Sequence, residues 1–391
     1  MTGAMLPEGA DAVVRVEDTD QAPGPRPLPE QVEIRVAPRP GLNVRRAGED
    51  VGLGDPVLGA GAVLSAAALS ALASAGAGSV RAVPRARVAV VSTGAELVDP
   101  GAAPPTGSIP DSNSVLLAGL VVEHGAALAS VSRSADTAAS LAGVLTAAAA
   151  GADLVVTSGG VSAGAFDPLT MLAGDQAALD EGREMLAEDR AAGAAIRLRF
   201  ARVAMQPGKP QGHGTVRADD GREVPLIALP GNPVSVLVSF RTIVAPALAR
   251  LMGRDGVGAA DADSVAGPVN GLAAPTRPRS GSRPPVRARA AEAWKTAGER
   301  RQYIPVRFVP APTGAAARPG RGTVGPTRWV APTHRLGSGS HLVASLPAAQ
   351  ALAVVEAGTP AVSVGDEVRL IALSRPAGPD DGELPPPLAE P

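Results

Sequence analysis

Two carboxylates and one lysine lie in short glycine-containing segments that each follow an apolar run. Glu96 lies in the segment STGAEL, Asp167 ends the segment TSGGVSAGAFD, and Lys209 lies between two prolines in QPGKP. A carboxylate can ligate Mg²⁺ or accept a proton, and a lysine can present a point charge to an oxyanion. A solvated carboxylate, a helix N-cap and a surface lysine are the structural alternatives for these residues. The grouping favours chemistry on an anionic substrate.

Two further turns would bring backbone amides close to a ligand. The motif SGG at 158–160 follows one apolar run, and the motif PGN at 230–232 follows another and opens a long helical segment. Glycine lets the backbone approach a bound anion, and a helix start offers unpaired N–H groups. One such turn is often only a turn. Several at one edge of a sheet predict a binding site, whereas Asp111 in DSNS is expected to cap a helix in any case.

Strand-like and helical segments alternate through the middle of the chain. The apolar strand-like runs are residues 88–91, 128–131, 154–156 and 226–229, and the helical segments are residues 114–124, 138–150 and 234–252. This alternation predicts an α/β domain with a mostly parallel central sheet covered on both faces. Ligands bind such sheets at the carboxyl ends of the strands, so the loops described above should meet at one rim.

The flanking segments predict a multidomain chain. We expect a partial N-terminal β unit, with strands at 12–14 and 32–36, and a linker or dimerisation segment with a helix at 65–75. A β-rich C-terminal domain begins with a linker-like stretch at 254–290, and a polar insertion occupies 174–196. The predicted boundaries are 1–40, 41–84, 85–253, 254–375 and a disordered tail at 376–391.

Composition excludes several classes of function. The formal net charge of −2 gives no footprint for nucleic acid or an anionic membrane. The absence of cysteine excludes disulfides and thiolate chemistry, and four histidines without metal-ligand spacing argue against zinc. No uninterrupted apolar run reaches the length of a membrane span, and no signal peptide is recognisable. We therefore expect a cytoplasmic protein without nucleic-acid or membrane partners.

These loops, in this order, resemble the molybdopterin molybdenumtransferase family (bacterial MoeA and the gephyrin E domain). The matching segments are residues 2–14, 45–50, 92–97, 111–113, 158–164, 207–210, 230–235 and 337–345. The resemblance implies a homodimer that binds adenylylated molybdopterin and molybdate, requires Mg²⁺, releases AMP, and works with an adenylyltransferase and with molybdoenzyme acceptors.

Site residues also follow from the resemblance. It implies catalytic roles for Glu96, Asp167, Asp50 and Lys209, with Glu96 and Asp167 as Mg²⁺ ligands. The implied positions of the ligand cleft are Thr2, Asp111, Ser112, Ser158, Gly159, Gly160, Pro230, Gly231, Asn232, Arg300 and Ser340.

The sequence departs from the family pattern in three respects, one of which is the polar insertion at 174–196, longer than the usual connection. The family carries an upstream Asp-Asn-Ser-Ala-Met-Asp-Gly-Tyr-Ala segment that contributes a cleft carboxylate, and nothing like it occurs here. Ala95 and Gln206 replace an Asp and a Lys that are frequent at those places. We therefore expect poor AMP release unless the upstream segment is restored. Two alternatives stay open: an enzyme that adenylylates molybdopterin, which usually has a single domain and Thr-Gly in place of Val161-Ser162, and a non-catalytic pterin-binding scaffold.

Overall fold

The computed structural model describes residues 3–25, 27–161, 167–173, 196–254, 286–313, 328–335, 339 and 341–373. The chain forms two compact units, Met1–Val80 and Arg81–Pro391, and each is described by itself. Four predicted features lie outside the described residues: most of the insertion at 174–196, most of the linker-like stretch at 254–290, the tail at 376–391, and the cleft residues Thr2 and Ser340.

The N-terminal unit contains little regular structure. Its elements are the 3-10 turn η1 (Val16–Asp18) and helix α1 (Ala66–Ser74), which Ser65 caps by accepting a hydrogen bond from the Ala68 amide at 3.1 Å. The predicted helix is thus present. The predicted strands at 12–14 and 32–36 are wrong, because the described part of this unit contains only one isolated bridge, Thr19 to Ile34. A strand needs a neighbour for its backbone groups, and the apolar side chains here remain exposed.

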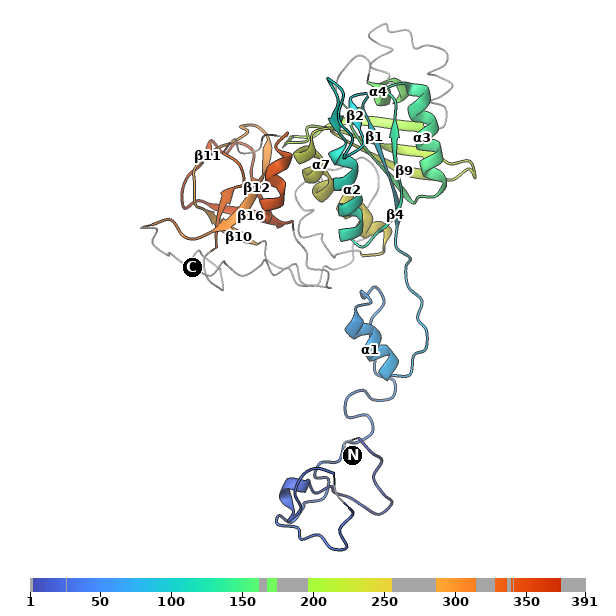
Figure 1. The fold of residues 1–391 in the computed structure, drawn as a ribbon, viewed down its shortest axis with the longest axis vertical. Coiled ribbons are helices and arrows are strands. Elements are labelled where there is room, and N and C mark those ends of the chain that lie inside the picture. The colour runs from blue at the N-terminus through green and yellow to red at the C-terminus, as the bar shows by residue number, and fades with distance from the viewer. Residues whose placement is uncertain are drawn as a thin grey trace. The chain divides into compact units, whose positions relative to one another are not determined.

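The second unit opens with the predicted α/β domain (Figure 1). Its elements before the second domain are β1 (Arg87–Thr93), β2 (Leu97–Val98), β3 (Ile109–Pro110), α2 (Ser112–Glu123), β4 (Ala127–Ser134), α3 (Ala138–Ala150), β5 (Leu154–Ser158), α4 (Pro168–Ala173), β6 (Ile196–Arg202), β7 (Met205–Gln206), β8 (Pro210–Arg217), β9 (Glu223–Leu229), α7 (Pro233–Ser239), η3 (Phe240–Val244) and α8 (Ala245–Leu251). Each of the four predicted strands and the helix at 138–150 is present.

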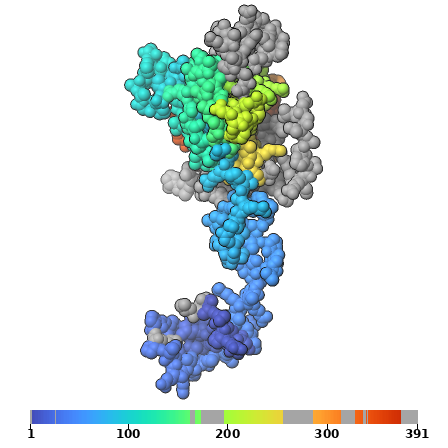
Figure 2. All heavy atoms as spheres, turned by 90° about the vertical axis from the view of Figure 1, so that its right-hand side faces the viewer, coloured from blue at the N-terminus to red at the C-terminus, as the bar shows by residue number. Residues whose placement is uncertain are grey.

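The central sheet has the order β4-β1-β5-β9-β8-β6. Neighbours from β4 to β9 are parallel, whereas β8 and β6 are antiparallel to the strands beside them. Helices α3 and α4 cover one face with a core of Val, Leu and Ala, and α2, α7 and α8 cover the other. In Figure 2 the atoms of this domain (teal to yellow) form one continuous body. The mostly parallel α/β fold is therefore confirmed.

The helical segment predicted at 234–252 is interrupted. Residues Phe240–Val244 form a π-helical turn between α7 and α8. Pro246 lies in the first turn of α8 and has no N–H to donate, which prevents a regular α-helical bond at this point. The helical stretch Pro233–Leu251 is long and apolar enough for a membrane span. However, 56% of its most apolar 18-residue stretch is buried, as in the core helix of a globular domain.

The C-terminal domain is β-rich, as predicted. Its elements are β10 (Arg287–Ala290), β11 (Trp294–Lys295), β12 (Arg301–Val309), β13 (Trp329–Pro332), η4 (Val343–Ala348), β14 (Ala351–Val355), β15 (Ala361–Val362) and β16 (Glu367–Ala372). Because β12 pairs with β13 as well as with β14, the strands β13-β10-β16-β14-β12 close into a ring. Strand β10 lies inside the predicted linker at 254–290, so that prediction is wrong for residues 287–290.

The two domains of this unit share a sheet edge. Strand β7, which belongs by sequence to the α/β domain, pairs in parallel with β12 of the C-terminal domain. A buried apolar cluster joins Met205, Val234 and Val238 to Tyr303, Leu352, Val354 and Ile371. The loop after β7 carries Lys209, so this junction lies directly beside a predicted functional segment.

Candidate functional site

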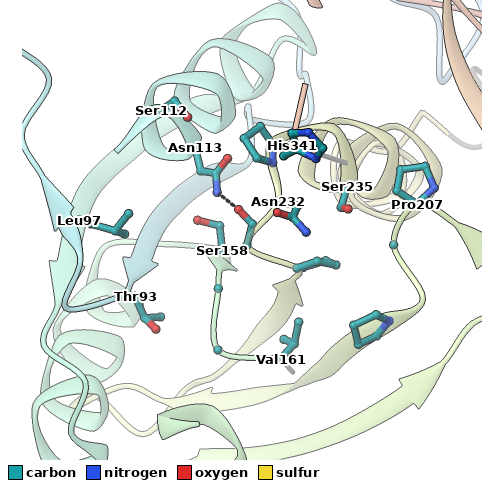
Figure 3. Close-up of a pocket in the computed structure, with 18 of the residues that line it drawn as sticks. Thr93, Leu97, Ser112, Asn113, Ser158, Val161, Pro207, Asn232, Ser235 and His341 are labelled. Carbon is teal, nitrogen blue, oxygen red and sulfur yellow. Dashed lines mark hydrogen bonds between the residues drawn. The ribbon is translucent and has the colours of Figure 1, made fainter. Parts of the chain in front are cut away.

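A pocket of about 1440 Å³ lies where the loops after β1, β4, β5, β7 and β9 meet (Figure 3). It contains most of the predicted site residues: Glu96, Asp111, Ser112, Ser158, Gly159, Gly160, Asp167, Lys209, Pro230, Gly231, Asn232 and Arg300. Asp50 belongs to the Met1–Val80 unit. The expected meeting of several loops at one rim of the sheet is observed.

Glycine is required in the turn after β5. Gly159 has φ of +90°, and a Cβ atom there would lie 2.5 Å from the Thr93 carbonyl oxygen. A Cβ on Gly231 would lie 3.5 Å from the Gly159 Cα, so the loops after β1, β5 and β9 touch one another through their backbones. The Gly159 amide donates to the Leu229 carbonyl at 3.1 Å. It is therefore already bonded, and the expectation that it faces an oxyanion is wrong for this amide.

Asp111 holds the floor of the pocket together. Its carboxylate is buried and accepts hydrogen bonds from the Ser92 hydroxyl at 2.5 Å and the Ser114 amide at 3.0 Å. The predicted capping role is confirmed, and the same group links the end of β1 to the start of α2. Both carboxylate oxygens are engaged, which leaves Asp111 a structural part of the pocket wall.

Asn113 is a pocket residue that the sequence reasoning missed. Its side-chain amide donates to the Gly231 carbonyl at 2.6 Å, and Figure 3 shows the side chain pointing from α2 toward Ser158 and Asn232. Its Oδ1 and the Ser158 hydroxyl are buried without a hydrogen-bond partner among the described residues. Such an orphaned group costs about 1–3 kcal/mol. A polar ligand in the pocket would relieve this cost.

Carboxylates reach the pocket from the loops after β1, β4 and β5. Glu96 is exposed, and its carboxylate accepts no hydrogen bond from any described residue. Asp167 accepts from the Leu169 amide at 3.2 Å, so the predicted alternative of a helix cap is present. Asp136 was missed, although it follows strand β4 as the other site segments follow theirs. It accepts from the Ala95 amide at 2.8 Å.

These oxygen donors fit Mg²⁺ but do not enclose it. Within the described ranges, no group of at least three acidic, histidine or cysteine side chains is close enough to hold a metal ion. Mg²⁺ commonly binds one or two carboxylates together with substrate phosphates and water. The Glu96 carboxylate, which accepts no hydrogen bond from the described residues, and the Asp167 carboxylate of the same pocket suit that mode of binding.

Basic side chains reach the pocket from the loop after β7 and from the C-terminal domain. Lys209 is exposed, and its side-chain ammonium has no ion-pair or hydrogen-bond partner in the part of the chain that the structure describes. The C-terminal domain contributes Arg300 and His341, the second of which the sequence reasoning missed. Opposite charges on the walls of one pocket suit an anionic ligand that also carries a metal ion.

Three family models match successive parts of the chain. The MoeA N-terminal region (domains I and II) matches residues 1–76, the probable molybdopterin-binding domain matches 89–250, and the MoeA C-terminal region (domain IV) matches 287–373. Their order along the chain is that of the units and domains described above.

Named relatives agree with these models. The chain is 41% identical over 255 residues to molybdopterin molybdenumtransferase 2 of Mycobacterium tuberculosis, and 36% identical over 256 residues to the molybdopterin molybdenumtransferase of Haemophilus influenzae. Each match covers 65% of this chain and 56% of the relative, so the chain spans about half the length of these curated relatives.

A solved structure has a similar fold. The molybdopterin biosynthesis MoeA protein of Pyrococcus horikoshii matches with a TM-score of 0.62 and 25% identity, over 95% of this chain and 74% of that one. The chain belongs to the MoeA family.

Proposed function

We propose that this protein inserts molybdate into adenylylated molybdopterin and releases AMP. The observation that carries the proposal is a single pocket that is lined by the carboxylates of Glu96 and Asp167, by the cations of Lys209 and Arg300, and by buried polar atoms without a partner among the described residues. Molybdate and a pyrophosphate group are anions, and the pterin and nucleoside carry neutral polar groups. The cations of the pocket suit the anionic parts of such a substrate, and its polar groups suit the neutral parts.

The proposed roles follow from this set of lining residues. Lys209 and Arg300 hold the oxyanions, while Ser158, Asn113 and Asn232 contact the neutral parts of the substrate. Glu96 and Asp167 would hold Mg²⁺, which when bound neutralises charge on the phosphoanhydride that is cleaved. Lys209 has no competing partner among the described residues, so its charge remains available to the substrate.

The remaining expectations belong to the same proposal. We keep the catalytic role that the resemblance implies for Asp50 and the ligand-binding roles that it implies for Thr2 and Ser340, and we expect a homodimer that works in the cytoplasm. An adenylyltransferase would supply the substrate and molybdoenzymes would receive the product. Two relatives with 41% and 36% identity carry the name molybdopterin molybdenumtransferase, which supports this assignment.

The test is AMP release by the purified chain, assayed with and without the upstream Asp-Asn-Ser-Ala-Met-Asp-Gly-Tyr-Ala segment of the family, given adenylylated molybdopterin, Mg²⁺ and molybdate. Glu96→Gln keeps the size of the side chain and removes its charge, so we expect the rate to fall about 100-fold, as for the loss of one electrostatic contact to the reacting group. Glu123→Gln is the matched control, because Glu123 is exposed at the end of α2 and is not among the pocket residues.

The other outcomes separate the alternatives. Pterin binding without AMP release in any variant would favour the scaffold. Formation of adenylylated molybdopterin from molybdopterin and ATP would favour the adenylyltransferase. Equal loss in Glu96→Gln and Glu123→Gln would contradict the role of Glu96.

A further inference from the structure

The position of Glu96 is fixed through its backbone and not through its side chain. The Glu96 carbonyl accepts from the Ile109 amide at 2.8 Å, which begins the short parallel pairing of β2 with β3. The Glu96 carboxylate has no hydrogen bond from any described residue. Whatever directs this carboxylate into the pocket must therefore act on the neighbouring peptide groups.

Both neighbours of Glu96 are held from the end of strand β4. On one side, the Ala95 amide donates to the Asp136 carboxylate at 2.8 Å. On the other side, the Leu97 carbonyl accepts from the Arg133 guanidinium at 2.7 Å. Arg133 is the β4 residue paired with Ser92 of β1, so the sheet register itself sets the place of this guanidinium. Two bonds from one strand end thus bracket the single residue Glu96.

Arg133 is suited to this role by its chemistry. Its planar guanidinium offers donors in fixed directions, one to the Leu97 carbonyl and another to the Asp99 carboxylate. Its side chain is 30% exposed, whereas that of Asp99 is 80% exposed. An ion pair with so exposed a carboxylate contributes little by itself. The more sheltered bond to the Leu97 carbonyl is the one that fixes the chain beside Glu96.

We propose that Arg133 is a positioning residue that holds the Glu96 carboxylate in the pocket through the Leu97 carbonyl. The inference rests on the proposed function of Glu96. It assigns to Arg133 no contact with the substrate, and Arg133 is not among the residues that line the pocket.

The experiment compares Arg133→Met with Asp99→Asn. The Met variant keeps an apolar stem of similar length and removes both hydrogen bonds, whereas Asp99→Asn weakens the ion pair and leaves the bond to Leu97 intact. We expect AMP release to fall about tenfold in Arg133→Met, because a small displacement of a reacting group is costly, and to stay within about twofold of wild type in Asp99→Asn. Arg133→Lys, with one donor retained, should recover part of the loss.

Two further measurements separate positioning from a general effect on folding. In the Glu96→Gln background, Arg133→Met should cause no additional loss, because residues that act through one another are not additive. Hydrogen exchange should become faster at the Leu97 and Ile109 amides in Arg133→Met and remain unchanged in Asp99→Asn. The Leu97 amide follows Glu96 directly in the chain, and the Ile109 amide donates to the Glu96 carbonyl.

The failure of the inference is distinct from the failure of the proposed function. Absence of AMP release from the wild-type sequence even with the upstream segment restored contradicts the function itself. With an active wild type, equal rates for Arg133→Met and Asp99→Asn, or an unchanged exchange at Leu97 and Ile109, would overturn the role of Arg133. A full tenfold loss in the Glu96→Gln background would do so as well.

Discussion

The floor and the rim of the pocket are built in different ways. The floor consists of the buried Asp111 and Asn113 and of the Gly159 turn, all of which are bonded to neighbouring loops. The rim carries Glu96 and Lys209, which are exposed and make no side-chain bond to any described residue. The floor therefore depends on folding, whereas the rim is available for chemistry. Substitutions in the two regions should separate stability from activity.

The largest expected effect is in the floor. Gly159→Ala would place a Cβ atom 2.5 Å from the Thr93 carbonyl oxygen at a φ of +90°. We expect a loss of about 3 kcal/mol in the free energy of unfolding, measured by urea denaturation. Gly101→Ala is the control, since Gly101 has the same φ and no atom within 4 Å of the added Cβ. Its loss should be about 1 kcal/mol, and equal losses would contradict the steric account.

Removal of the Asp111 carboxylate should have the next effect. Asp111→Ala removes the cap of α2 and leaves the Ser92 hydroxyl without its acceptor in a buried place. We expect a loss of about 2–3 kcal/mol in the free energy of unfolding. Thr137→Ala, which removes only the cap of α3, should cost about 1 kcal/mol. A smaller loss at Asp111 than at Thr137 would show that the link to β1 contributes nothing.

At the rim, binding should change without stability. Lys209→Ala removes a charge that has no partner among the described residues. We expect the Kd for adenylylated molybdopterin or molybdate to rise about tenfold, as for one charge-assisted contact, with no change in Tm. Lys295→Ala, on β11 and outside the residues that line the pocket, is the matched control. A drop in Tm for Lys209→Ala would place this residue with the floor.

The smallest effect concerns a surface pair that belongs to neither region. The hydrogen bond from Arg87 lowers the pKa of Asp153 below its ordinary value. A carboxyl with a lowered pKa in the folded state stabilises the protein above its ordinary pKa of about 3.9, and this contribution is lost as pH falls through the lowered pKa. Asp153→Asn should slightly flatten the fall of stability in acid. Unchanged acid stability would show that the pair contributes nothing.

The sequence predicted the α/β domain well because its strands are buried on both faces. Continuous apolar runs such as Val88–Val91 can form strands only inside a covered sheet, so pattern and burial agree. Residues 32–36 alternate apolar and charged side chains, which is also typical of a strand, but their apolar side chains are exposed and they form no strand. Periodicity reports the side chains of a strand and not the presence of a neighbour.

The site was predicted in outline for a related reason. The rule that ligands bind at strand ends located most of the pocket, including Glu96 and Lys209. It would also have located Asp136 after β4. Asn113 and His341 could not be found in this way, because their places depend on contacts between distant segments, such as the bond from Asn113 to Gly231. The use of the Gly159 amide by Leu229 was likewise invisible in the sequence.

The pairing of β7 with β12 has a consequence for how the pocket opens. Lys209 follows β7, and Arg300 directly precedes β12, so hydrogen-bonded strands connect the segments that carry these two cations of the pocket. A hinge motion that separated them would have to break the hydrogen bonds between β7 and β12 and expose the apolar cluster that joins the two domains. The segments that carry Lys209 and Arg300 should therefore keep a constant distance from each other. Binding of an anion should then proceed in a single kinetic phase.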